Sequence, residues 1–179
     1  KVNQLIVNKE ISTRHNPSDL INDFQLGGNT KFAITVSKIG NPIIYNITDA
    51  QGHELHNGDP KLDINLAHHS QILKCKLLSN GDLATCDKNG LIKIHELTLG
   101  QLKYTLKGHS DWVWGLDEVA GEALVSVSND CTMKFWTPKD QVCYKTVMSP
   151  QNKSIRCLKV LSETRLAFAS ERIWIYNTL

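Results

Sequence analysis

Two short stretches of the sequence hold residue types used in metal binding and in nucleophilic catalysis. His53-Glu54-Leu55-His56 is one residue short of the HExxH zinc motif, so two histidines cannot share one helix face at i and i+4. His68, His69, Asp59 and Asp63 lie nearby in the sequence. Imidazoles in a polar loop are usually solvated, so we predict no metal site and no cofactor.

His109-Ser110-Asp111 contains the three residue types of a hydrolase triad. A triad needs a set geometry in space, and adjacency along the chain does not supply it. The sequence has no GxGxxG or GxxxxGK[ST] phosphate loop and no GxSxG nucleophile elbow. We therefore predict no catalytic residues and a protein that is not an enzyme.

Composition narrows the class of protein further. The 179 residues fit one domain, and a hydrophobic fraction of 41% excludes a disordered chain. Lys+Arg 20 against Asp+Glu 18 gives a net charge of +2, so no general attraction to nucleic acid or membrane is expected. No window approaches 18 apolar residues, and no signal peptide is visible. The odd number of cysteines, 5, favours free thiols in a reducing compartment, cytoplasmic or nuclear.

Hydrophobic residues recur along the chain with a period of 2, which is typical of β-strands. Such strands would position the histidines and acids named above. Short alternating runs are bounded by Asn, Asp, Gly or Ser, as strands joined by tight turns require. Ser18 to Leu26 could instead form a short helix, but it is poorly capped, and we expect a strand there. The clearest runs are Leu83–Cys86, Leu91–Ile94, Leu124–Val127 and Met133–Trp136.

An apolar-x-apolar-aromatic pattern recurs along the chain. Its copies end at His95, Trp136 and Tyr176, with steps of 41 and 40 residues, and an earlier copy ends at Tyr45. Further strand-like runs precede and follow each copy, giving about four strands in each unit. A unit of about 40 residues is the period of a propeller blade. The predicted fold is all-β, a β-propeller or partial propeller of four four-stranded blades.

The best copy of this unit resembles the WD-repeat family. It has Gly108-His109 at its start, then Leu124 to Asp130, and it closes with Phe135-Trp136. The resemblance implies a hydrogen-bonded structural tetrad of His109, Ser126, Asp130 and Trp136. A closed network of buried polar groups would lock one turn geometry.

The preceding copy implies a degenerate tetrad of His69, Thr85, Asn89 and His95. The last copy keeps Tyr176 but has a shortened turn, and the first copy is the weakest. No copy ends in the literal Trp-Asp pair. The resemblance covers about residues 66 to 179.

The predicted organisation is a single propeller domain or fragment spanning 1–179, with blade-like units at 18–66, 67–107, 108–147 and 150–179. In one interpretation a strand at 4–8 pairs beside Ile173 to Tyr176 and closes a four-bladed ring. In the other, the chain is a fragment of a larger propeller, and a companion chain covers its open blade faces. The missing initiator Met favours the fragment.

The resemblance implies a non-catalytic scaffold that binds other proteins or peptides in a larger complex. Trp112 and Trp114 flank Val113, so they share one side of a strand. Two alternatives stay open: a nucleic-acid-associated propeller of a ribonucleoprotein or chromatin, and the accessory propeller of a multidomain kinase or ubiquitin-pathway protein. The candidate protein-binding residues are Gln71, Lys74, Asp111, Trp112, Ser154 and Arg156.

Overall fold

The structure is a computed structural model that describes residues 21–27, 32–37, 42–46, 60–63, 68–119 and 123–178. Within these ranges the regular structure is β-strand, apart from one 3-10 turn at Pro150–Asn152. No helix in this part of the chain is long and apolar enough to cross a membrane. The expected strand at 4–8 and the histidines His53 and His56 lie outside the described residues.

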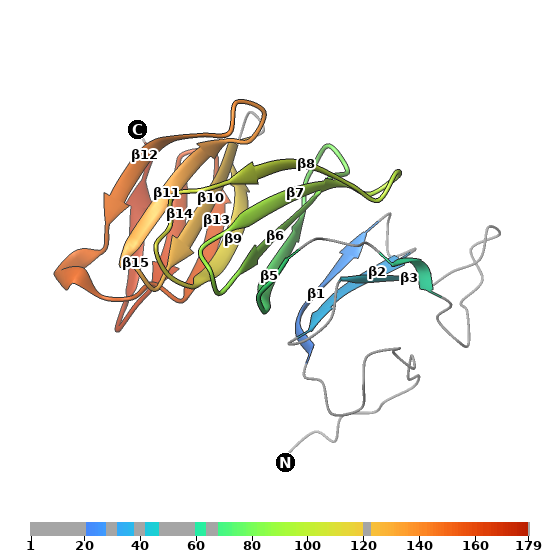
Figure 1. Cartoon of the computed structure of the whole chain (residues 1–179). Helices are drawn as coiled ribbons and strands as arrows, with labels where there is room; N and C mark the ends of the chain where they lie inside the picture. Colours follow the sequence, from blue (N-terminus) through green and yellow to red (C-terminus); the bar gives the residue numbers. More distant parts are fainter. Residues whose placement is uncertain are drawn as a thin grey trace, which may run out of the picture.

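The strands form four antiparallel sheets that follow one another along the chain (Figure 1). Within each sheet the strand order follows the chain order, so each strand pairs with the next one along the chain. The first sheet holds β1 (Ile21–Gly27), β2 (Phe32–Ser37), β3 (Ile43–Asn46) and β4 (Pro60–Asp63). The second sheet holds β5 (Ile72–Leu77), β6 (Leu83–Asp87), β7 (Ile92–Glu96) and β8 (Gln101–Leu106). The third sheet holds β9 (Val113–Val119), β10 (Ala123–Ser128), β11 (Thr132–Thr137) and β12 (Val142–Met148), and the fourth holds β13 (Cys157–Ser162), β14 (Arg165–Ala169) and β15 (Ile173–Asn177).

The all-β fold predicted from the period-2 pattern is confirmed, and β1 is the strand expected near Ser18 to Leu26. The alternating residues from Ile155 to Val160 predict a strand that starts at Ile155, but β13 starts at Cys157. The reason is that the amide of Ile155 donates to the carbonyl of Ser128 in the third sheet, 3.0 Å away. This segment therefore joins two sheets before β13 starts.

The hydrophobic core lies between neighbouring sheets. Between the second and third sheets, Ile92 and Ile94 pack against Leu116 and Trp136 in one buried cluster. At the next junction, β9 approaches β13 closely, because a Cβ on Gly115 would come within 3.2 Å of Leu158 Cβ. Among the described residues, the extensive contacts between sheets join only neighbours: first to second, second to third, and third to fourth.

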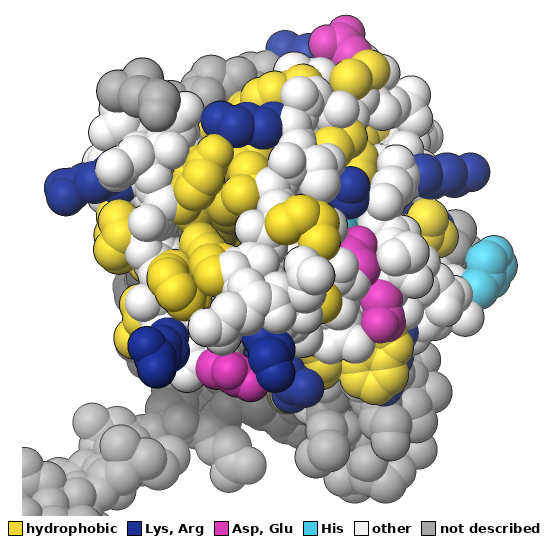
Figure 2. Space-filling view, turned by 90° about the vertical axis from the view of Figure 1, so that its left-hand side faces the viewer, with side chains coloured by type: hydrophobic (Ala, Val, Ile, Leu, Met, Phe, Trp, Pro, Cys, Tyr) yellow, Lys and Arg dark blue, Asp and Glu magenta, His cyan; other side chains and the backbone are white. Residues whose placement is uncertain are grey.

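Apolar side chains remain exposed on the two outer sheets. On the fourth sheet, Ile173 and Ile175 are 79% and 58% exposed. Figure 2 views this end of the molecule and shows apolar side chains gathered on it. At the other end, Phe24 of β1 is 60% exposed. Each end of the row thus presents apolar surface of the kind that the inner sheets bury against one another.

Candidate functional site

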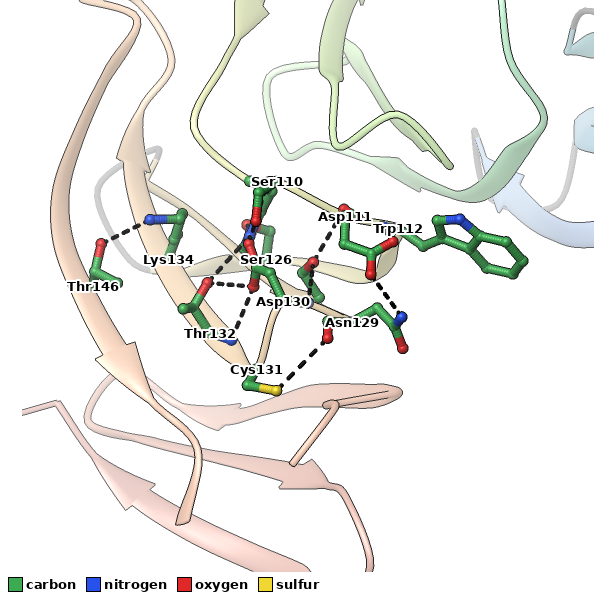
Figure 3. A network of polar contacts seen from close by, with 12 residues as sticks. Ser110, Asp111, Trp112, Ser126, Asn129, Asp130, Cys131, Thr132, Lys134 and Thr146 are labelled. Atoms are coloured by element: carbon green, nitrogen blue, oxygen red, sulfur yellow. Dashed lines mark hydrogen bonds and ion pairs between the residues drawn. The ribbon is translucent and has the colours of Figure 1, made fainter. Parts of the chain in front are cut away.

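A buried polar network ties the third sheet together (Figure 3). His109 lies between two partners: its Nδ1 is 2.7 Å from Asp130 Oδ2, and its Nε2 is 2.7 Å from Ser126 Oγ. Trp136 Nε1 donates to the same hydroxyl over 2.8 Å. The structure thus brings together all four residues of the tetrad that the WD-repeat resemblance implies.

The two ends of this network have fixed roles. The indole N–H of Trp136 donates to Ser126, and the Asp130 carboxylate accepts from His109 Nδ1–H. Burial alone would raise the pKa of Asp130, but hydrogen bonds from His109 and Thr132 outweigh it and hold that pKa well below its usual range. The carboxylate is therefore charged and fully engaged.

Ser126, His109 and Asp130 also stand in the order of a hydrolase triad. Ser126 is fully buried, however, and its oxygen already accepts a hydrogen bond from Trp136. A nucleophile must be reachable by substrate, and a hydroxyl in the packed interior is not. The geometry fits a structural lock for the turn between β10 and β11.

A second network holds the second sheet, but with partly different residues from those predicted. His68, not His69, contacts Thr85 Oγ1 (2.9 Å) through Nε2 and Asp87 Oδ2 (2.8 Å) through Nδ1. His69 is exposed. The assignment of His69 and Asn89 to this tetrad is therefore corrected to His68 and Asp87.

Spacing explains the correction. His109 precedes Ser126 by 17 residues and Trp136 by 27, and His68 precedes Thr85 and His95 by the same intervals. The sequence therefore carried the signal for His68. Asp87 lies two residues before the position that corresponds to Asp130, and its other oxygen accepts from the amide of Asn89. Asn89 contributes only its backbone, which side-chain chemistry could not have indicated.

His95 stands where the third sheet has Trp136, and it closes its network less well. Its Nε2 lies 3.4 Å from Thr85 Oγ1, and its Nδ1 is buried without a hydrogen-bond partner. Burial is the main cause that lowers the pKa of His95 to about 3, followed by the nearby His68 and Lys93. The imidazole is thus neutral in the folded protein.

A ladder of cations and indoles lies at the ends of the sheets where the first strands begin. Lys88 Nζ lies 3.9 Å from the ring centroid of Trp112, and the rings of Trp112 and Trp114 are 5.4 Å apart. The guanidinium of Arg156 lies 5.6 Å from the Trp114 ring. We call these four residues the cation–aromatic ladder. It takes one member from the second sheet, two from the third and one from the segment before β13.

Polar side chains buttress the ladder. Asp111 Oδ2 accepts from Asn129 Nδ2 over 2.8 Å, and Asn129 Oδ1 accepts from the hydroxyl of Ser154 over 2.6 Å. The carbonyl of Trp112 accepts from the amide of Asn129. Figure 3 shows the Trp112 indole pointing away from this polar network. Asn129 was not among the predicted residues, although it stands beside the predicted Asp130.

Of the six candidate binding residues, four gather at the ladder: Asp111, Trp112, Ser154 and Arg156. Gln71 lies beside them through its backbone, because its carbonyl accepts from the amide of Lys88. Lys74 lies elsewhere, on β5, where it pairs with Asp23 of β1 at 2.8 Å. Although burial opposes the charged amine, this pairing raises the pKa of Lys74. Lys74 therefore joins two first strands and does not contribute to the ladder.

The ladder depends on a glycine. Gly90, in the turn between β6 and β7, has a φ of +80°, a backbone conformation in which L side chains are strained. A Cβ there would lie 2.5 Å from the carbonyl oxygen of His109. The turn that carries Lys88 thus packs directly on the backbone of the third sheet's entry loop, which brings the amine over Trp112.

Metal-binding chemistry has little support in the described ranges. These residues contain no group of three or more His, Cys, Asp or Glu that could hold a metal ion. All five cysteines have free thiols, and burial raises the pKa of Cys75 and Cys86 well above the usual value. These two thiols are part of the packed core.

Comparisons with known proteins agree with the four-sheet fold and with the tetrad of the third sheet. Residues 100–137 match the family model of the WD domain, G-beta repeat. The WD40 β-propeller domain of Doa1 superposes with a TM-score of 0.74 over 87% of this chain, at 17% identity. Residues 100–137 are thus similar to a WD repeat, and the chain has the β-propeller fold. It spans 50% of the Doa1 chain.

Two further proteins are similar to this chain. The structure of U3-55K gives a TM-score of 0.74 at 25% identity, covering 90% of this chain and 50% of that one. The nuclear distribution protein PAC1-1 of Uncinocarpus reesii is 34% identical over 82 residues, which are 44% of this chain and 18% of that protein. The chain therefore corresponds to only part of these relatives.

Proposed function

We propose that this chain is a non-catalytic scaffold that binds other proteins or peptides at the cation–aromatic ladder. The observation that carries the proposal is the ladder itself, because Trp and Arg side chains are the residue types that most often dominate binding energy at protein interfaces. The ladder lies on loops that three sheets hold in place.

Rigidity supports this function. The Asp111–Asn129–Ser154 hydrogen bonds and the close packing at Gly90 fix the loops before any partner arrives. A surface that is already ordered loses little conformational entropy on binding. The WD40-type fold favours the same function, since its blades usually serve as interaction modules.

A random dodecapeptide library panned on the immobilised chain tests the proposal. Peptides enriched on the wild type should fail to bind Trp112→Ala, which keeps the backbone carbonyl that Asn129 needs. The matched control is Tyr144→Ala, an aromatic side chain 53% exposed on β12, which should bind the same peptides. Enriched peptides that bind Trp112→Ala as tightly as wild type, or no enrichment at all, would refute the proposal.

We also propose that a further sheet from a companion chain covers the outer face of the fourth sheet. The exposed Ile173 and Ile175 support this, because soluble monomers rarely leave such a face in water. Native mass spectrometry should detect a complex with a second polypeptide, and Ile175→Arg should release it. A monomer at every concentration would favour the self-closed ring instead.

The cytoplasm or nucleus is the proposed location. The free thiols fit a reducing compartment, and PAC1-1 is named for nuclear distribution. A fluorescent fusion that entered the secretory pathway would contradict this proposal.

A further inference from the structure

We infer that the ladder recognises a peptide segment bearing two carboxylates, one for Lys88 and one for Arg156, at most about four residues apart. This inference rests on the proposed function and adds the chemistry of the partner. It follows from the charges, the spacing and the covered ring faces of the ladder.

The two cations at the ends of the ladder have no acidic partner in the described part of the chain. The ion pairs there join other residues, and none includes Lys88 or Arg156. The acids that neighbour the ladder in the chain are already engaged: Asp87 by His68, and Asp111 by Asn129. Both cations are thus available to carboxylates of a partner.

The length of the ladder limits the spacing of those carboxylates. The three steps from Lys88 to Arg156 measure 3.9, 5.4 and 5.6 Å, so the two charges lie at most about 15 Å apart. An extended peptide advances about 3.3 Å per residue. Two acidic side chains at most about four residues apart on an extended segment would therefore reach both ends.

The ladder fits carboxylates better than phosphates. A phosphate carries up to two negative charges and is best held by several donors that converge on it. Here the cations stand at opposite ends of two indoles, so each position offers one cation. A single carboxylate matches a single Lys or Arg.

A peptide also fits better than a nucleic acid. Bases bind single-stranded sites by stacking on open aromatic faces. Lys88 covers one face of Trp112, and Trp114 packs against the same indole at a tilt of 54°.

The peptides enriched in the panning experiment provide the test. We expect an excess of Asp and Glu at two positions at most about four residues apart. A synthetic copy with both acids changed to Gln should bind at least tenfold more weakly to the wild type. Lys88→Gln and Arg156→Gln should each weaken the acidic peptide at least fivefold, while the Gln peptide should bind these variants and the wild type alike.

Lys145→Gln is the matched control, because its amine also lies over aromatic rings, 5.7 Å from Phe135, but on β12. It should leave binding unchanged. Neutral or basic peptides that depend on Trp112 would overturn the inference while leaving the proposed function intact. The inference would also be overturned if phosphoserine at both positions bound tenfold tighter than Glu, or if a single-stranded RNA 10-mer bound more tightly in a Lys88- and Arg156-dependent way.

Discussion

The second and third sheets each contain a buried polar network, but the two networks are built from different residues. In the third sheet, an indole, a hydroxyl, an imidazole and a carboxylate form a chain in which each polar atom has a partner. In the second sheet, His95 replaces the indole, and one of its nitrogens is left buried without a partner. The carboxylate of Asp87 also comes from an earlier position than that of Asp130.

The difference shows which part of the network the fold requires. Both sheets keep a histidine bonded to a hydroxyl on the second strand and to a carboxylate at or just after its end. The partner on the third strand varies. Because the histidine joins the entry loop to the turn, it sets the loop geometry, while the third-strand residue adds stability.

Removing the carboxylate of the third sheet should have the largest effect. Asp130→Ala would leave four donors without their acceptor: His109 Nδ1, the amides of Ser110 and Thr132, and the Thr132 hydroxyl. We expect a loss of about 3 kcal/mol in the free energy of unfolding, measured by urea denaturation. Asp87→Ala, which removes three such bonds, should cost about 1 kcal/mol less. Equal losses would mean that the two networks contribute alike.

Corresponding turn positions provide the next test. Gly90 and Cys131 stand at the same place in the two sheets, and both have a left-handed backbone. Gly90→Cys should lose about 2 to 3 kcal/mol, because its Cβ would strike the His109 carbonyl. Cys131→Gly should change stability by less than about 1 kcal/mol, because it relieves the backbone but loses the Sγ contact with Asn152. Urea denaturation of both variants measures the contrast, and a tolerated Gly90→Cys would contradict the close packing.

The stability of the folded protein should depend on pH because of His95 in the second sheet. The folded pKa of His95 is lowered to about 3, against 6.5 for an unperturbed histidine. Below pH 6.5 the unfolded chain therefore binds a proton that the folded chain does not, and stability falls as pH falls. The expected loss is about 2 kcal/mol between pH 7.5 and pH 5.

His95→Trp is the variant that isolates this effect. It removes the titrating group and offers an indole N–H to Thr85, as Trp136 offers one to Ser126. Asp87 and Asp130 have lowered pKa values, so their stabilising effect is present above about pH 4 and is lost only in more acidic solution. If the slope between pH 5 and 7.5 were unchanged in His95→Trp, the assignment to His95 would be wrong.

The smallest effect should come from making the third sheet more like the second. Thr132 Oγ1 donates to Asp130 over 2.6 Å, whereas the corresponding residue of the second sheet, Leu91, has no hydroxyl. Thr132→Val should cost about 1 kcal/mol in chemical denaturation. No loss would show that the hydroxyl is dispensable in a network that already has three other donors.

The sequence predicted the sheets well because a period of 2 and a repeat near 40 residues both depend on local pattern. It also named the four residues that meet in the third sheet. It failed at Asp87, because the position from which a carboxylate reaches His68 depends on the path of the turn. It also failed at Lys88, because the place of its amine depends on how that turn packs against the next sheet. That packing follows from Gly90, whose missing Cβ matters only once His109 is placed beside it.

The arrangement in which each sheet packs extensively only on its neighbours has a consequence for how such a chain changes over evolutionary time. The networks of the second and third sheets each close within their own sheet, and extensive packing among the described residues reaches only the next sheet along the row. Duplication or deletion of one repeat unit therefore leaves the internal bonds of the others intact and alters a single junction. The second and third sheets could accordingly diverge, one keeping its indole and the other losing it, without a compensating change in the other.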